Sequence, residues 1–191
     1  MSEPDVRPRV TAADGRRIFA YFPAAVLVYV VDDSGKVLLL SDRASGKWEV
    51  VSGALEADET VLEGAQREAR EELGPAVRLR PLGPVHVASI HYDAKIRDMI
   101  DIGYLFAYEG GEIVPGDDAA GFAFRWWTLD ELAADDVRVI VPHGQKWLFA
   151  RAVDLHLLWR GTDHPLQPTP TPQIDLLEGW TAAAGLGDVQ S

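Results

Sequence analysis

The sequence has no cysteine among its 191 residues. This absence excludes a disulfide scaffold, a metal site built on thiolates and a catalytic cysteine nucleophile. The fold must therefore be stable without covalent cross-links. The hydrophobic fraction of 47% is that of an ordinary globular protein, so a sizeable core can form.

Positive charge is scarce. Eighteen Lys and Arg residues stand against 30 Asp and Glu residues, which gives a formal net charge of −12 at pH 7. Such a chain lacks the electrostatic attraction that nonspecific binding to nucleic acid or to an anionic membrane surface requires, and we expect neither partner. If the protein handles phosphate groups, something other than its own net charge must neutralise them.

Long hydrophobic runs are absent as well. The longest extends from Phe22 to Val31, about half the length that a bilayer-spanning helix needs. The first ten residues are polar and contain two prolines, unlike a secretory signal. The sequence therefore predicts a soluble, cytoplasmic protein, and its length favours one domain with a short extension.

Strand and helix patterns alternate along the chain. Residues 23–31 and 36–40 are rich in aliphatic residues and flank the turn sequence DDSG, which predicts a β-hairpin. Further strands are predicted over 47–51, 76–80, 85–91, 98–108 and 122–128. Helical patterns cover 60–73 and 145–159, and a short capped helix is predicted to begin at Thr128. The inner stripe of the 145–159 helix is expected to consist of Trp147, Leu148, Ala152 and Leu155.

Composition divides the chain into three parts. Residues 1–19 are expected to form an N-terminal arm or edge strand, and residues 20–160 the main domain. The sequence HPLQPTPTPQ then carries four prolines in ten residues, which cannot continue a helix. Residues 161–191 are therefore interpreted as a proline-rich C-terminal tail. The sequence leaves open whether the protein forms a homodimer, with this tail and the last helix as contact elements.

The segment from residue 53 to residue 74 carries the chemistry. On a helix over 60–73, Glu68, Glu71 and Glu72 share one face. Like charges placed together repel unless a cation lies between them, and Mg²⁺ or Mn²⁺ prefers oxygen ligands. The alternative for such a run of charges is a solvated helix face. Gly64 lies on the same acidic face, where the missing side chain is expected to leave space for a ligand. The opposite stripe is apolar and should face a sheet; it consists of Leu62, Ala65, Ala69 and Leu73.

The spacing of this segment resembles the signature of the Nudix hydrolase family, G-x5-E-x7-R-E-U-x-E-E-x-G-U, in which U is an aliphatic residue. All seven fixed positions match, namely Gly53, Glu59, Arg67, Glu68, Glu71, Glu72 and Gly74. Ala69 and Pro75 replace larger aliphatic residues, and Ser52 and Asp58 stand where many members have glycine. The resemblance covers roughly residues 20–160. It implies the α/β/α Nudix sandwich, with a mixed β-sheet and the catalytic helix at about 60–73.

The resemblance also implies roles for individual residues. The carboxylates of Glu68, Glu71 and Glu72, together with the main-chain carbonyl of Ser52, would hold Mg²⁺ or Mn²⁺. The metal would neutralise the phosphates and activate the attacking water. Arg67 and Glu59 would form an ion pair that fixes the loop against the helix. The general base stays open; the candidates are Glu71, Glu72, Asp117 and Asp118.

The implied substrate is a small nucleotide, a nucleoside diphosphate linked to another group, such as a nucleoside triphosphate. A dinucleoside polyphosphate, which Tyr92 modestly favours, and a nucleotide sugar are alternatives. A catalytically silent module that senses a nucleotide is another. The remaining aromatic and histidine residues are interpreted as packing or surface residues rather than ligands; these are Trp48, Trp126, Trp127, His86 and His91.

Overall fold

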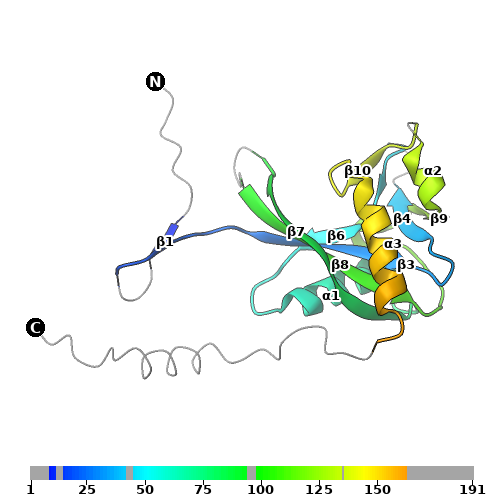
Figure 1. The fold of residues 1–191 in the computed structure, drawn as a ribbon. Helices are drawn as coiled ribbons and strands as arrows, with labels where there is room; N and C mark the ends of the chain where they lie inside the picture. The colour runs from blue at the N-terminus through cyan, green and yellow to red at the C-terminus, as the bar shows by residue number, and fades with distance from the viewer. Residues whose placement is uncertain (1–8, 12–14, 42–44, 94–97, 135, 163–191) are drawn as a thin grey trace, which may run out of the picture.

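The computed structural model describes residues 9–11, 15–41, 45–93, 98–134 and 136–162 (Figure 1). The proposed tail from residue 163 onward lies outside the described residues, as do residues 1–8 of the proposed arm. Among the helices of the described ranges, none has the length and apolar character needed to cross a membrane.

The predicted α/β fold with a mixed sheet is confirmed. The strands are β1 (Arg9–Thr11), β2 (Ile18–Ala20), β3 (Ala24–Val31), β4 (Val37–Ser41), β5 (Trp48–Glu49), β6 (Val51–Ala54), β7 (Leu79–His91), β8 (Asp98–Tyr108), β9 (Ala123–Trp127) and β10 (Val139–Val141). The helices are α1 (Val61–Leu73), α2 (Leu129–Ala133) and α3 (Trp147–Trp159), with a 3₁₀ turn η1 (Asp117–Ala119). Two of the predicted strands are one continuous strand, β7, and β10 was not predicted.

Strand β3 is at the centre of the sheet. It pairs in parallel with β8 and antiparallel with β4 and β6. Strand β7 extends the sheet beyond β8, while β5, β9 and β10 extend it on the β4 side. Strands β1 and β2 form a separate antiparallel ribbon whose Ile18 and Phe19 side chains are exposed. This topology leaves β6 beside β3, next to the start of α1.

The predicted hairpin between β3 and β4 is confirmed, and its turn is stabilised by Asp32. The Oδ1 atom of Asp32 accepts hydrogen bonds from the main-chain N–H groups of Ser34 and Lys36, both at 2.9 Å. Gly35 has φ +80°, a conformation that side chains disfavour. The turn sequence itself therefore specifies the reversal of chain direction between β3 and β4.

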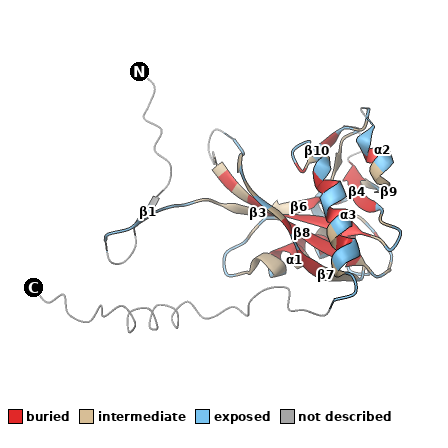
Figure 2. Ribbon diagram, viewed as in Figure 1, coloured by how far each residue is buried: buried red, intermediate tan, exposed pale blue. Residues whose placement is uncertain are grey.

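Two hydrophobic cores lie on opposite faces of the sheet (Figure 2). Alternate residues of β3 point to the two sides, so Leu27 and Tyr29 pack toward α3 while Val26 and Val28 pack toward α1. Because both faces are covered, β3 and β4 are apolar along nearly their whole length. This sandwich fixes α1 against the sheet.

The inner stripe of α3 differs from the prediction. Trp147 is 59% exposed, whereas Phe149 is fully buried. Trp147 is the first helical residue and is not among the buried residues of the helix. The buried stripe is therefore rotated, and it consists of Leu148, Phe149, Ala152, Val153 and His156. Leu155 packs against the same core while remaining partly exposed.

The burial of Phe149 gives a first prediction. Phe149→Ala should lower the free energy of unfolding by about 3–5 kcal/mol, because it removes a fully buried ring and leaves a cavity. Urea unfolding followed by circular dichroism measures the change. Leu158→Ala, on the same helix but 67% exposed, is the control and should change stability by less than about 0.5 kcal/mol. Equal effects of the two substitutions would contradict the observed orientation of α3.

Candidate active site

Helix α1 begins and ends where its sequence specifies. The Thr60 hydroxyl accepts a hydrogen bond from the Glu63 N–H, and the Glu63 carboxylate accepts one from the Thr60 N–H at 2.8 Å, forming a capping box. Gly74 ends the helix with φ +92°. Within the predicted apolar stripe, Ala65 and Leu73 are among the residues buried against the sheet. The acidic face is thereby turned toward β6 and its loop.

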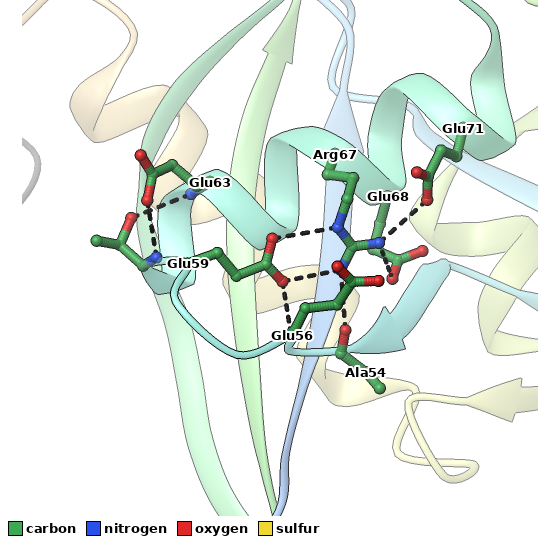
Figure 3. Close-up of polar contacts among 8 residues, drawn as sticks. Ala54, Glu56, Glu59, Glu63, Arg67, Glu68 and Glu71 are labelled. Carbon is green, nitrogen blue, oxygen red and sulfur yellow. Dashed lines mark hydrogen bonds and ion pairs between the residues drawn. The ribbon is translucent and has the colours of Figure 1, made fainter.

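Arg67 ties the loop before α1 to the helix (Figure 3). Its guanidinium donates to both carboxylate oxygens of Glu59, at 2.8 and 3.1 Å, and to the Ala54 carbonyl at 3.0 Å. Its remaining nitrogen donates to Glu68 Oε1 at 2.8 Å and to Glu71 Oε2 at 3.1 Å. One side chain thus connects β6, the loop and two of the helix carboxylates.

Glu59 also shapes the loop directly. Its Oε1 accepts a hydrogen bond from the Glu56 main-chain N–H at 2.7 Å. Hydrogen bonds from Arg67 and from the Glu56 N–H hold the pKa of Glu59 below its usual range. Glu59 therefore braces the loop as an anion, whereas the helix carboxylates line the adjacent cavity.

The role expected for Gly64 was wrong. A Cβ at Gly64 would lie 2.7 Å from the Leu55 side chain and 2.8 Å from Glu59 Oε1. The space left by the missing side chain is thus filled by the loop rather than available to a ligand. Asp58, which stands in place of a frequent glycine, has φ +68°, a conformation that Asp tolerates better than most residues.

Glu68, Glu71 and Glu72 of α1 face an acidic cavity. Its lining joins the end of β6 to α1 and η1, and consists of Ser52, Gly53, Ala54, Glu56, Arg67, Glu68, Glu71, Glu72, Asp117 and Asp118. The structure therefore brings together the proposed metal ligands and all the candidate bases. Ser52 lies within β6, paired in register with Leu27, and its φ is not positive. Serine consequently fits where many family members have glycine.

Burial and like charge act together on two of the carboxylates. The pKa of Glu72 is raised to about 8, chiefly by burial and also by the neighbouring charges of Glu68, Glu49 and Asp118, against a hydrogen bond from the Ser52 backbone. Burial also raises the pKa of Glu68, which the nearby Arg67 opposes. A bound cation would stabilise both anions, so the environment fits a divalent metal.

The donor set also fits a hard cation chemically. Carboxylate oxygens and a main-chain carbonyl are the ligands that Mg²⁺ and Mn²⁺ prefer. Among the described residues, no three His, Asp or Glu side chains converge as metal ligands. Arg67 instead bridges Glu68 and Glu71. Arg67 therefore holds one oxygen of each of these two carboxylates.

Comparison with known proteins identifies the family. The family model of the NUDIX domain matches residues 21–148, which is more than half of the chain. The chain belongs to the Nudix hydrolase family. Phosphatase NudJ of Escherichia coli strain K12 is 32% identical to it over 114 residues, covering 58% of this chain and 71% of NudJ.

Solved structures support the same fold. An ADP-ribose pyrophosphatase from Streptococcus suis superposes with a TM-score of 0.57 at 17% identity, covering 75% of this chain and 96% of its own. A MutT protein from Methanosarcina mazei Go1 superposes with a TM-score of 0.54 at 21% identity. The match covers 70% of this chain and 93% of the MutT chain. Nudix family members are pyrophosphohydrolases of small nucleotide substrates that generally need divalent metal ions, and this Nudix protein is accordingly an enzyme.

Two residues outside the signature had been assigned no function. His86 was interpreted as an ordinary, partly exposed residue, yet its side chain is only 10% exposed and lies beside the buried Asp101. Asp101 is a charged residue among the apolar residues in the interior of β8, which is the sequence signal that could have singled it out. The tryptophans pack as expected, with Trp48 against Trp127 and Trp126 against Tyr108.

Gly53 provides a test of this site. A Cβ at Gly53 would overlap the Glu68 carboxylate, so Gly53→Ala should displace that side chain. We expect Mg²⁺ affinity to fall by about tenfold or more while the melting temperature changes little. Isothermal titration calorimetry with Mg²⁺ measures the affinity. Gly161→Ala is the control, since nothing lies within 4 Å of its Cβ position. Unchanged affinity in Gly53→Ala would remove Glu68 from the metal site.

Proposed function

We propose that this Nudix protein is a Mg²⁺- or Mn²⁺-dependent hydrolase that cleaves the diphosphate linkage of a nucleoside diphosphate bearing another group, such as a nucleoside triphosphate. The observation that carries the proposal is the acidic cavity. It joins three α1 glutamates, the β6 backbone and two η1 aspartates in one place. An acidic cavity alone repels phosphates, so a divalent cation is needed for the two to meet.

Each residue has a separate task in this proposal. Glu68, Glu71, Glu72 and the Ser52 carbonyl hold the metal, which supplies charge neutralisation and an acidified water. Arg67 and Glu59 position the loop. The general base comes from a carboxylate that lines the same cavity, and the candidates remain Glu71, Glu72, Asp117 and Asp118. Because Asp117 and Asp118 already line the cavity, neither has to swing in from elsewhere.

The names of related proteins support the proposed substrate class. Their names include a phosphatase and an ADP-ribose pyrophosphatase. Dinucleoside polyphosphates and nucleotide sugars contain the same diphosphate linkage and are therefore alternative substrates. A silent nucleotide-sensing module would be expected to lack one of the signature carboxylates, and all of them are present in this chain.

Neutralising the metal ligands tests the proposal. Glu68→Gln and Glu72→Gln should each reduce Mg²⁺-dependent hydrolysis by at least about a hundredfold, because each removes an anionic ligand from the cation. Chromatography of the products from nucleoside triphosphates, ADP-ribose, nucleotide sugars and dinucleoside polyphosphates measures turnover. Excess EDTA should abolish turnover by the unmodified protein.

A matched substitution separates ligand loss from general charge loss. Glu112→Gln removes one negative charge at an exposed position away from the cavity lining, and it should leave turnover unchanged. Wild-type turnover in both Glu68→Gln and Glu72→Gln would contradict the metal assignment. Thermal stabilisation by Mg²⁺ and a nucleotide without turnover of any substrate would favour the sensing module.

A further inference from the structure

A second cavity, the arginine cavity, lies against the face of α1 that points away from the acidic cavity. It has a volume of about 240 Å³, and its lining comes from α1, the start of β7 and the end of β8. The lining residues are Gln66, Ala69, Arg70, Val77, Arg78, Leu79, Phe106 and Glu109. None of them lines the acidic cavity. The two cavities are therefore separate sites on opposite faces of one helix.

Two guanidinium groups line the arginine cavity without a carboxylate partner. Elsewhere, Arg67 and Arg80 form ion pairs. Among the residues that the structure describes, Arg70 and Arg78 form none. The one carboxylate in the lining, that of Glu109, is paired with Arg80 at 2.8 Å. In a protein with 30 acidic residues, two positive charges thus line one cavity without a paired counter-charge.

The turn after β8 holds the Arg78 guanidinium in place. Its Nη2 atom donates a hydrogen bond to the Glu109 main-chain carbonyl at 3.0 Å. The Arg78 main chain is fixed as well, because its N–H donates to the Gly110 carbonyl at 2.8 Å and its carbonyl accepts from the Glu109 N–H at 2.9 Å. A Cβ at Gly110 would lie 2.7 Å from Arg78 Nη2. The guanidinium is therefore positioned before a ligand arrives, which lowers the entropic cost of binding.

Local structure explains only part of this arrangement. Arg70 lies in the last turn of α1, where the helix dipole favours a cation. The dipole does not account for a second guanidinium at the same cavity, where like charges repel unless an anion lies between them. The cavity also has an apolar floor, since Ala69 and Phe106 are 2% and 1% exposed. A cleft lined by charges of one sign over apolar walls concentrates their field and attracts the opposite charge.

We propose that the arginine cavity is a second binding site, which takes a phosphate group. The fork of a guanidinium matches the geometry of phosphate oxygens, and two arginines balance the charge of about −1.5 to −2 that a phosphate group carries at pH 7. A water molecule occupies about 30 Å³ of the liquid, so the cavity has room for the group. The site goes beyond the proposed function, because it requires neither a metal ion nor the carboxylates of the acidic cavity.

Titration with inorganic phosphate in EDTA tests the proposal by NMR. We expect saturable binding with a dissociation constant of about 1 mM or lower. The amide shifts should concentrate at Arg78 and Gly110, while the Gly53 amide at the acidic cavity stays unchanged. Acetate, with one charge and two oxygens, should bind at least about tenfold more weakly. Absence of saturable phosphate binding, equal binding of acetate, or shifts centred on Gly53 would overturn the proposal.

Substitutions at the two arginines locate the site. Arg70→Ala and Arg78→Ala should each weaken phosphate binding by about tenfold or more, because each removes a charged hydrogen-bond donor. Arg138→Ala removes the same charge at an exposed position outside the cavity, and its dissociation constant should stay within about twofold of the wild-type value. Unchanged binding in both cavity variants, or equal weakening by Arg138→Ala, would overturn the assignment. Melting temperatures check folding, and if a variant fails to fold, the shift map of the unmodified protein decides.

AMP in EDTA distinguishes two sources of the phosphate group. If a phosphate ester occupies the arginine cavity, AMP should compete with inorganic phosphate and lose affinity in both Arg70→Ala and Arg78→Ala. AMP binding that neither substitution changes, together with phosphate binding that both weaken, would identify the free ion as the ligand. These titrations contain no metal, so their outcome is independent of whether the protein hydrolyses nucleotides.

Discussion

The geometry of the acidic cavity depends on the Arg67 guanidinium. It anchors the loop through Glu59 and Ala54, and it holds Glu68 and Glu71 from the other side. Because a guanidinium is planar and always charged, it can make these contacts in fixed directions at once. Lysine has no such fork and could not replace it. The loop, the edge strand and the helix are consequently positioned as one unit.

Part of the negative charge of the chain is concentrated at the acidic cavity. A net charge of −12 excludes passive attraction of phosphates, yet Glu68 is buried and Glu72 partly buried near other carboxylates. Arg67 offsets part of this repulsion. Burial, together with the charges of Glu68, Glu49 and Asp118, still raises the pKa of Glu72. A divalent cation is the natural complement, since it neutralises the carboxylates and the phosphates of a nucleotide together.

Features that depend on neighbouring residues in the sequence could be predicted, whereas features that depend on contacts between distant segments could not. Helix α1 and its acidic face follow from spacing within fourteen residues, and the hairpin follows from its turn residues. The cluster of Asp101, His86 and His143 could not be predicted, because β7, β8 and the segment that follows β10 meet only through sheet pairing and the packing around α3. The exposure of Trp147 was mispredicted for a related reason. Periodicity defines a stripe, but the sheet decides which rotation of the helix is buried.

Strand β6 lies between the acidic cavity and the cavity beside Asp101, and its residues line both of them. In a strand, successive residues point to opposite faces, so Gly53 faces Glu68 while Ser52 and Ala54 face away from it. The absence of a side chain at Gly53 lets the carboxylate approach the strand closely. The α1 carboxylates therefore lie on one side of β6, and the cavity lined by Asp101 and His143 lies on the other. The acidic cavity and the cavity beside Asp101 are thus built from different elements, and they share the β6 residues Ser52, Gly53 and Ala54.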